Sequence, residues 1–197
     1  MAPPPEKGDT MISSVPDVHE REKLPYLPPQ PEIREAGVFL ERLAGDPAFL
    51  EGVILPLLDE VKDAGDWHVA RRHDSPDGSY SLQIFVWPPG TRTRIHDHSS
   101  WGAYRCLVGS VLEERYKRLD DASTPEHAHL KKIWELRWSR EDGASTVFPY
   151  DNGIHRVGNT SDDPAISVHL YGPRLGGEID GRDYDPSRNY VCDRIES

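Results

Sequence analysis

The sequence predicts an all-β domain, a barrel or sandwich, that follows a short helical segment. From Trp67 onward, short β-rich runs alternate with turn signals, and no helical period separates them. Helical spacing of apolar residues occurs only before that point. The length of 197 residues suits one domain with a small extension. We therefore expect an arm over residues 1–31, a helical preface over 32–65 and a β-barrel domain over 66–197.

The predicted arm is rich in proline, with Pro3, Pro4 and Pro5 at its start and "LPYLPP" over residues 24–29. Few large apolar residues accompany these prolines, and such a composition does not build a packed core. Two alternatives stay open for this arm. It is either disordered or draped over the domain in an extended form.

The helical preface contains two candidate helices. Gly45 ends the first, Asp46 offers a helix cap, and Pro47 suits the first position of the second helix. Pro56 interrupts the second apolar stripe and should kink or split that helix. The expected apolar positions are Ile33, Phe39, Leu40 and Leu43 in the first helix and Phe49, Val53, Ile54, Leu57, Leu58 and Val61 in the second.

The predicted barrel begins with the run "SYSLQIFVW" over residues 79–87, in which apolar and polar residues alternate. The turns "SPDG" and "PPG" bound this run. Later runs that predict strands are "AYRCLVG", "SVLEERYKR", "HLKKIWELRW", "STVFP", "IHRVGN" and "AISVHLYG". The charged stretch "EERYKRLDD" reads as a solvated strand end.

The composition excludes some classes of partner. A formal net charge of −11 argues against nucleic acid and anionic membranes, because a phosphate surface needs a basic face. Cys106 and Cys192 are too few for a disulfide framework. The N-terminus lacks an apolar leader, and no segment approaches the ~18 apolar residues of a membrane span. We expect a monomer in the reducing cytoplasm.

Two histidines one residue apart, His96 and His98, are the first candidates for chemistry. Side chains at positions i and i+2 of a strand face the same side, so both imidazoles could bind one metal ion. The alternative is a pair of histidines on a solvent-exposed face. Asp97 points the other way by the same alternation and should be structural.

The surroundings of these histidines resemble the two motifs of the cupin superfamily. Gly90 precedes His96 by five intervening residues. The second block runs from Gly143 through Pro149, Gly153 and His155 to Asn159, and is one residue longer than usual between Pro149 and His155. The resemblance implies a cupin double-stranded β-helix, a jelly-roll barrel, with metal ligands His96, His98 and His155.

One departure from the cupin pattern concerns the glutamate ligand of the first motif, whose place is taken by Gly102. Three neutral imidazoles leave the charge of a divalent metal uncompensated and leave coordination positions open. Such a site accepts an anionic ligand, for example a thiolate. The ligand set alone does not select the metal, because imidazole suits Fe, Zn, Cu and Ni.

The stretch "AISVHLYG" places Ser167, His169 and Tyr171 on one face of one strand. Together with "HDHSSWG" it resembles the thiol dioxygenases of the cysteine dioxygenase type, over about residues 67–172. The resemblance implies Fe(II) as cofactor and a reaction that adds both atoms of O2 to the sulfur of a small thiol, giving a sulfinic acid. Tyr171 would act near the reacting atoms, with His169 and Ser167 holding its hydroxyl.

A second departure places the chain near the bacterial branch of that family, which includes cysteine and 3-mercaptopropionate dioxygenases. Animal enzymes carry a cysteine linked to the tyrosine after the H-x-H motif. Here that position is Gly102, or Ala103 if the loop is aligned differently. Cys106 lies on the following strand and reads as a small buried apolar residue.

The substrate carboxylate should be bound by an arginine, because the guanidinium group matches it with two parallel hydrogen bonds. The candidates are Arg71 on the early strand, with Arg72 beside it, Arg182 near the C-terminus, and Arg94 on the predicted face of His96. Each could instead be a solvated surface charge.

Three functions stay open at this point. The first is an iron-dependent thiol dioxygenase that uses a small thiol carboxylate and O2 as substrates. The second is a cupin enzyme with Ni, Mn or Zn that acts as an isomerase, lyase or carbon-cleaving dioxygenase. The third is a non-catalytic cupin that binds a small ligand. The residues Ser167, His169 and Tyr171 and the glycine at position 102 favour the first.

Overall fold

The computed structural model describes residues 30–174 and 179–195. The proline-rich arm predicted over residues 1–31 lies outside the described residues, apart from its last two, whose backbone begins the first described helix.

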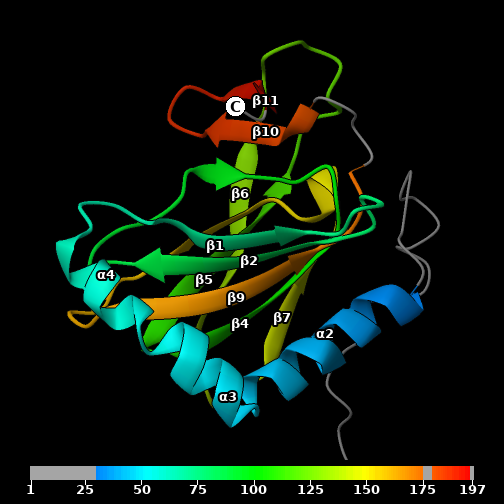
Figure 1. The fold of residues 1–197 in the computed structure, drawn as a ribbon. Coiled ribbons are helices and arrows are strands. Elements are labelled where there is room, and N and C mark those ends of the chain that lie inside the picture. The colour runs from blue at the N-terminus through cyan, green and yellow to red at the C-terminus, as the bar shows by residue number, and fades with distance from the viewer. Residues whose placement is uncertain (1–29, 175–178, 196–197) are drawn as a thin grey trace, which may run out of the picture.

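Two antiparallel sheets form the body of the molecule (Figure 1). The first has the strand order β1 (His68–Asp74), β2 (Ser81–Trp87), β9 (Ala165–Tyr171), β4 (Gly102–Val108) and β7 (Ala144–Val147). The second has the order β11 (Tyr190–Ile195), β10 (Ile179–Asp185), β3 (Ile95–His96), β8 (His155–Gly158), β5 (Ser110–Arg118) and β6 (Leu130–Ser139). This architecture confirms the predicted all-β class and is consistent with a jelly-roll barrel.

Each β-rich run that the sequence predicted as a strand is a strand in the structure, within a few residues at its ends. The runs did not indicate β10 and β11, because charged residues interrupt "IDGRDYD" and "YVCDRI". These two strands form one edge of the six-stranded sheet, and β10 also pairs with β3. They thereby cover the strand that carries His96.

The N-terminal helices are α2 (Gln30–Ala44), the single turn α3 (Pro47–Phe49), the π-helical turn η1 (Leu50–Ile54) and α4 (Leu57–Asp63). Asp46 caps α3 as expected, with its carboxylate 2.9 Å from the backbone nitrogen of Ala48. Pro56 separates η1 from α4, so the expected interruption of the second helix is confirmed. A short 3-10 turn, η2 (Tyr150–Asn152), precedes β8.

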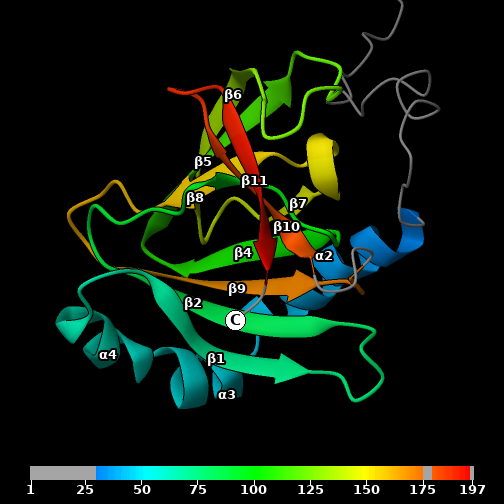
Figure 2. The same ribbon diagram turned by 90° about the horizontal axis from the view of Figure 1, so that it is seen from above.

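The helices cover the outer face of the five-stranded sheet (Figures 1 and 2). One hydrophobic cluster joins them to that sheet, with Leu40 and Leu57 packed against residues such as Ile84 and Val168. Because helices cover one face and the second sheet covers the other, β9 is buried on both faces. Alternate side chains of β9 therefore point either to the helices or to the space between the two sheets, and neither set points to solvent.

The second interior lies between the sheets. Phe85 and Trp87 of β2 and Tyr104 and Cys106 of β4 point into it, opposite to their neighbours that face the helices. Ser167 of β9 shares this inner orientation, with His169 and Tyr171 at the following alternate positions. The polar residues of β9 are thus held inside the barrel by the strand period.

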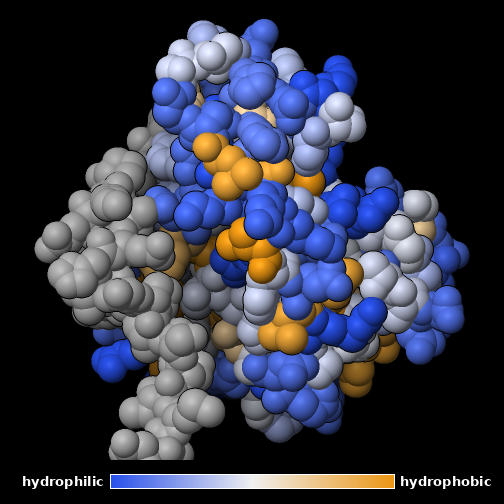
Figure 3. Space-filling view, turned by 180° about the vertical axis from the view of Figure 1, so that it is seen from behind, coloured by the Kyte–Doolittle hydropathy of each residue, from blue (hydrophilic) through white to orange (hydrophobic). Residues whose placement is uncertain are grey.

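The face seen from behind in Figure 3 is largely hydrophilic, with separate apolar patches. Ile133, Trp134 and Leu136 of the edge strand β6 are exposed, and the flanking Lys131 and Lys132 make such an edge less prone to pair with another strand. Among the described residues, no helix is both long enough and apolar enough to span a bilayer.

Candidate metal centre

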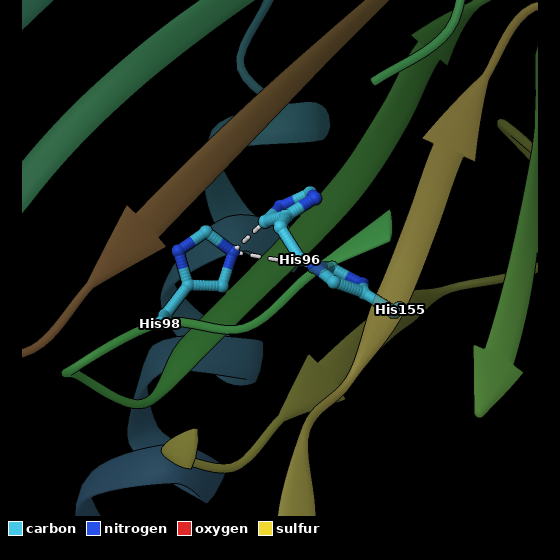
Figure 4. A group of neighbouring side chains, drawn as sticks. All are labelled: His96, His98 and His155. Carbon is cyan, nitrogen blue, oxygen red and sulfur yellow. Dashed lines mark hydrogen bonds between the residues drawn. The ribbon is translucent and has the colours of Figure 1, made fainter. Parts of the chain in front are cut away.

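Three histidines, His96, His98 and His155, point toward one another, as Figure 4 shows, and line the inner cavity. His96 is the last residue of β3 and pairs in register with His155, the first residue of β8. His98 follows β3 and turns back toward both. The short β3 strand lies between β8 and β10, so neighbouring strands hold its position.

The ring nitrogens of the three histidines are close to one another. His98 Nε2 lies 3.1 Å from His96 Nε2 and 3.2 Å from His155 Nε2. His96 Nδ1 donates to the carbonyl oxygen of Arg94 at 2.9 Å, and His155 Nδ1 donates to the carboxylate of Glu113 at 3.0 Å. A neutral imidazole carries one hydrogen, so both of these rings direct a lone pair at the same point.

This donor set fits a metal ion. One hydrogen on His98 Nε2 cannot satisfy two converging lone pairs well, whereas a cation can accept all three. A metal–nitrogen distance of about 2.1 Å would place adjacent ligand nitrogens roughly 3.0–3.4 Å apart, as observed for two of the pairs. Burial lowers the pKa of His96, His98 and His155, which favours the neutral form that binds metals. Within the described ranges, this is the group of side chains with metal-ligand geometry.

A buried carboxylate, Glu113, orients one of these rings. It is fully buried on β5 and accepts hydrogen bonds from His155 Nδ1, Trp138 Nε1 at 3.1 Å and Ser145 Oγ at 2.9 Å. Burial alone would raise the pKa of Glu113, but the bond from His155 and the charge of Arg115, 2.6 Å away, hold it at about 2. Glu113 therefore stays ionised and places a negative charge against His155, on the side of the ring that faces away from the metal site.

Glu113 and Arg115 correct the expectation that "EERYKRLDD" is a solvated strand end. Val111 is buried, and Glu113 lies two residues further along the same face of β5. A charged residue at a core-facing position of an alternating strand was the signal available in the sequence.

The three polar residues of β9 are joined by hydrogen bonds. Ser167 Oγ lies 2.8 Å from His169 Nε2, and His169 Nδ1 lies 3.0 Å from Tyr171 Oη. The Tyr171 ring lies beside His98, with ring centroids 5.1 Å apart. Burial raises the pKa of Tyr171, so its hydroxyl keeps its hydrogen at neutral pH.

Gly102 is the position that faces the Tyr171 ring. It pairs with Tyr171 across β4 and β9, and a Cβ atom at Gly102 would lie 3.0 Å from Cδ1 of that ring. Ala103 pairs with Leu170, whose side chain faces the helices. Cys106 is buried four residues along β4, and burial raises the pKa of its thiol to about 12, so it is inert.

A cavity of about 570 Å³ opens over the histidines. Trp67, Phe85 and Trp87 form a stacked aromatic wall, with ring centroids 5.6–6.0 Å apart. Tyr171 and the metal-ligand candidates form another side. The volume lies within the range of about 300–1,000 Å³ that is typical of small-molecule sites.

Two of the three predicted substrate-binding arginines lie away from this cavity. Arg71 points to α4, where its Nη2 lies 2.6 Å from Glu60 Oε1. Arg182 binds the buried Asp97 at 2.6 Å and also Asp151. The expectation that Arg71 and Arg182 line the site is therefore corrected, because acidic side chains outside the cavity bind both guanidinium groups.

Arg94 does line the cavity, but its side chain is 81% exposed and contacts Asp183 at 3.3 Å. Asp97 is buried in a structural position as expected, and the carboxylate oxygen that contacts the Arg182 guanidinium also accepts a hydrogen bond from Tyr184 Oη at 2.7 Å. This buried hydrogen bond connects Asp97, which lies between His96 and His98, to β10.

Three further arginines line the cavity: Arg72, which the sequence offered only as the neighbour of Arg71, and Arg174 and Arg194. A β-bulge between Val69 and Arg71 shifts the register of β1, so Arg72 pairs with Gln83 and shares its face. A regular strand would have given that face to Arg71, since Val69 also lines the cavity. Arg194 lies on β11, which the sequence pattern did not indicate.

Two facing antiparallel sheets that enclose three convergent histidines define a cupin-type barrel. The family model for cysteine dioxygenase type I matches residues 65–180, more than half of the chain. The protein belongs to this family, and membership supports an enzyme that incorporates oxygen.

The curated relatives agree with the family assignment. Cysteine dioxygenase type 1 of Rattus norvegicus is 28% identical over 144 residues, which are 68% of this chain and 70% of the relative. The Bos taurus enzyme is 32% identical over 101 residues, 51% of this chain and 48% of the relative. Among solved structures, an oxalate oxidase in complex with glycolate has a TM-score of 0.43 at 14% identity, covering 57% of this chain and 54% of that chain.

Proposed function

We propose that this protein is an Fe(II)-dependent thiol dioxygenase that converts a small thiol carboxylate, of the cysteine or 3-mercaptopropionate type, into its sulfinate. The observation that carries the proposal is the position of Tyr171 beside a cluster of three histidines that lacks a carboxylate ligand. The reaction adds both atoms of O2 to one thiolate sulfur, so atoms and electrons balance without a further reductant.

His96, His98 and His155 would hold the metal ion. Bound Fe(II) would supply the redox chemistry that joins O2 to sulfur, which protein side chains alone do not provide. Three neutral imidazoles leave the ion with a net positive charge, and this favours an anionic sulfur as a further ligand. Glu113 would fix the orientation of His155 and increase its basicity.

The remaining residues would bind and orient the substrate. Arg72 is our candidate for the substrate carboxylate, because the β1 bulge turns it to the cavity and its guanidinium matches a carboxylate. It replaces Arg71 in that role. The aromatic wall of Trp67, Phe85 and Trp87 would exclude water from the reacting sulfur.

Arg72 and Arg194 both line the cavity, and each already contacts an aspartate. Arg72 Nε lies 2.8 Å from Asp74, and the Arg194 guanidinium contacts Asp183 at 3.0 Å, Asp180 at 3.3 Å and the carbonyl oxygen of Asp97 at 2.8 Å. A substrate carboxylate would therefore have to compete with an aspartate at either arginine.

Oxygen uptake tests the proposal. The protein is loaded with Fe(II) without oxygen and then mixed with O2 and cysteine, 3-mercaptopropionate, mercaptosuccinate or cysteamine. We expect uptake with a carboxylate-bearing thiol and a product that is heavier by two oxygen atoms. Bound iron without uptake for any thiol would contradict the proposal and favour a cupin enzyme with Ni, Mn or Zn, and metal analysis of the purified protein would then follow.

A further inference from the structure

The hydrogen-bonded chain on β9 extends beyond Ser167 to an indole on the neighbouring strand. Trp87 Nε1 donates to Ser167 Oγ at 2.8 Å, and the two residues are 80 positions apart in sequence. Trp87 is 1% exposed and Ser167 is completely buried. An indole N–H only donates hydrogen bonds, so the direction of this contact is certain.

The indole determines what the Ser167 hydroxyl can do. Its oxygen accepts from Trp87, and its single hydrogen needs a separate acceptor. His169 Nε2 is the other partner of Ser167 Oγ among the described hydrogen bonds. If Nε2 carried a hydrogen, Ser167 would accept twice and its own hydrogen would be buried without a described acceptor. The arrangement with a bare Nε2 avoids this.

A bare Nε2 places the ring hydrogen of His169 on Nδ1. Burial lowers the pKa of His169 to about 3, so the ring is neutral and has only one hydrogen to place. Nδ1 lies 3.0 Å from Tyr171 Oη and therefore donates to it. The ring cannot flip freely, because Tyr104 stacks on it at 4.9 Å and Phe85 packs against it at 4.3 Å between centroids.

We propose that Trp87 is a positioning residue that sets the direction of this chain, from Trp87 through Ser167 and His169 to Tyr171. Because Tyr171 Oη accepts from His169, the hydroxyl hydrogen of Tyr171 is directed elsewhere, and the cavity is the space that this side chain lines. Tyr171 thus presents a hydrogen-bond donor to a bound ligand. The identity of the atom that accepts this hydrogen bond rests on the proposed function, where it would be an oxygen or sulfur atom of the reactants. The direction of the hydrogen bonds does not rest on the proposed function.

The direction can be read from the tautomer of His169. Protein labelled with 15N in histidine and loaded with diamagnetic Zn(II) would be measured by long-range 1H–15N correlation, which separates protonated from bare ring nitrogens. We expect a hydrogen on Nδ1 of His169 and none on Nε2. The reverse assignment would overturn the proposal. If the protein shows the expected tautomer but oxidises no thiol, the proposed function is contradicted and the inferred direction of the hydrogen bonds still stands.

The role of Trp87 is tested by Trp87→Phe, which removes the donor and keeps an aromatic ring. Ser167 can then accept from His169, so we expect the reverse tautomer to become populated. Phe85→Leu is the matched control, because Phe85 contacts the same imidazole ring without a hydrogen bond and its variant should keep the wild-type tautomer. An unchanged tautomer in Trp87→Phe would overturn the role of Trp87.

A further measurement does not depend on the folding of that variant. The indole hydrogen of Trp87 in the wild-type protein should resonate downfield and exchange slowly with solvent, as a buried hydrogen-bonded N–H does. An indole hydrogen that exchanges rapidly would show that the bond to Ser167 does not form, and the proposal would fail.

Discussion

At the scale of single residues, Glu113 acts on the metal site through its hydrogen bond with His155. It contacts no metal-directed nitrogen, yet it fixes the tautomer and orientation of His155. Replacing it by an uncharged residue leaves the three imidazoles in place but changes the basicity of one. The effect should therefore appear in metal affinity before it appears in the fold.

We expect Glu113→Gln to weaken metal binding by about 10–100-fold, the range observed when a partner of a ligand histidine is lost. A chelator competition assay with Fe(II) or Zn(II) measures this change. Glu114→Gln is the matched control, because Glu114 is the next residue on the same strand and binds Arg156 and Lys132 on the opposite face. Equal loss of affinity in both variants would contradict the role of Glu113.

Tyr171 is expected to act on the reaction and not on the metal. Tyr171→Phe removes the hydroxyl and keeps the ring that packs against His98. Oxidation should slow by roughly 10²-fold, comparable to the loss of one well-placed hydrogen-bond donor, while the iron content is unchanged. The rate of O2 uptake and the iron content per protein are the two measurements. A variant without iron would show that Tyr171 has a structural role.

At the scale of elements, the bulge in β1 decides which arginine reaches the cavity. Arg72 shares the face of Gln83, while Arg71 pairs with Glu60 of α4. Two adjacent residues of the same type thereby have different surroundings. This makes them a matched pair for testing substrate recognition.

Arg72→Gln should lower kcat/KM for a carboxylate-bearing thiol by about 10–100-fold. The range is modest because the Arg72 side chain is 40% exposed and solvent screens its charge. Arg71→Gln should leave kcat/KM unchanged, and cysteamine, which has no carboxylate, should be insensitive to either change. Steady-state oxygen uptake measures all three. A larger loss in Arg71→Gln would show that β1 is regular in solution.

Helix α2 contributes to stability through one face. Leu40 is completely buried against the five-stranded sheet, whereas its neighbour Phe39 is 45% exposed. Leu40→Ala should lower the free energy of unfolding by about 2–5 kcal/mol, and Phe39→Ala by under about 1 kcal/mol. Urea denaturation compares the two. Similar values would mean that α2 does not pack on β4 as described.

At the scale of the whole molecule, the barrel buries ionisable groups in its interior between the sheets, and acid should destabilise it. The pKa of His169 is about 3 in the folded protein because of burial, below its ordinary value of 6.5. As the pH falls below 6.5, the unfolded chain takes up a proton that the folded protein excludes until about pH 3. The contribution of this histidine to stability is therefore complete above pH 6.5 and is lost in that window.

We expect the free energy of unfolding to fall with decreasing pH in this window by at most about 1.4 kcal/mol per pH unit for each such histidine. His169→Gln removes one titrating group, so its pH dependence should be shallower by up to one proton. Urea midpoints at several pH values measure the slopes of both proteins. Parallel slopes would show that His169 is protonated in the folded state.

The sequence by itself determined the strand runs, the interruption at Pro56 and the residues of the histidine and Ser167–Tyr171 motifs. These features depend on short-range period and turn chemistry, which neighbouring residues specify. The tertiary structure alone decided the surroundings of Glu113, the choice of Arg72 over Arg71, and the contact of Trp87 with Ser167. Each depends on strand register or on a partner far along the chain. The local pattern of a single sequence does not identify that partner, even where it marks a core-facing position, as at Glu113.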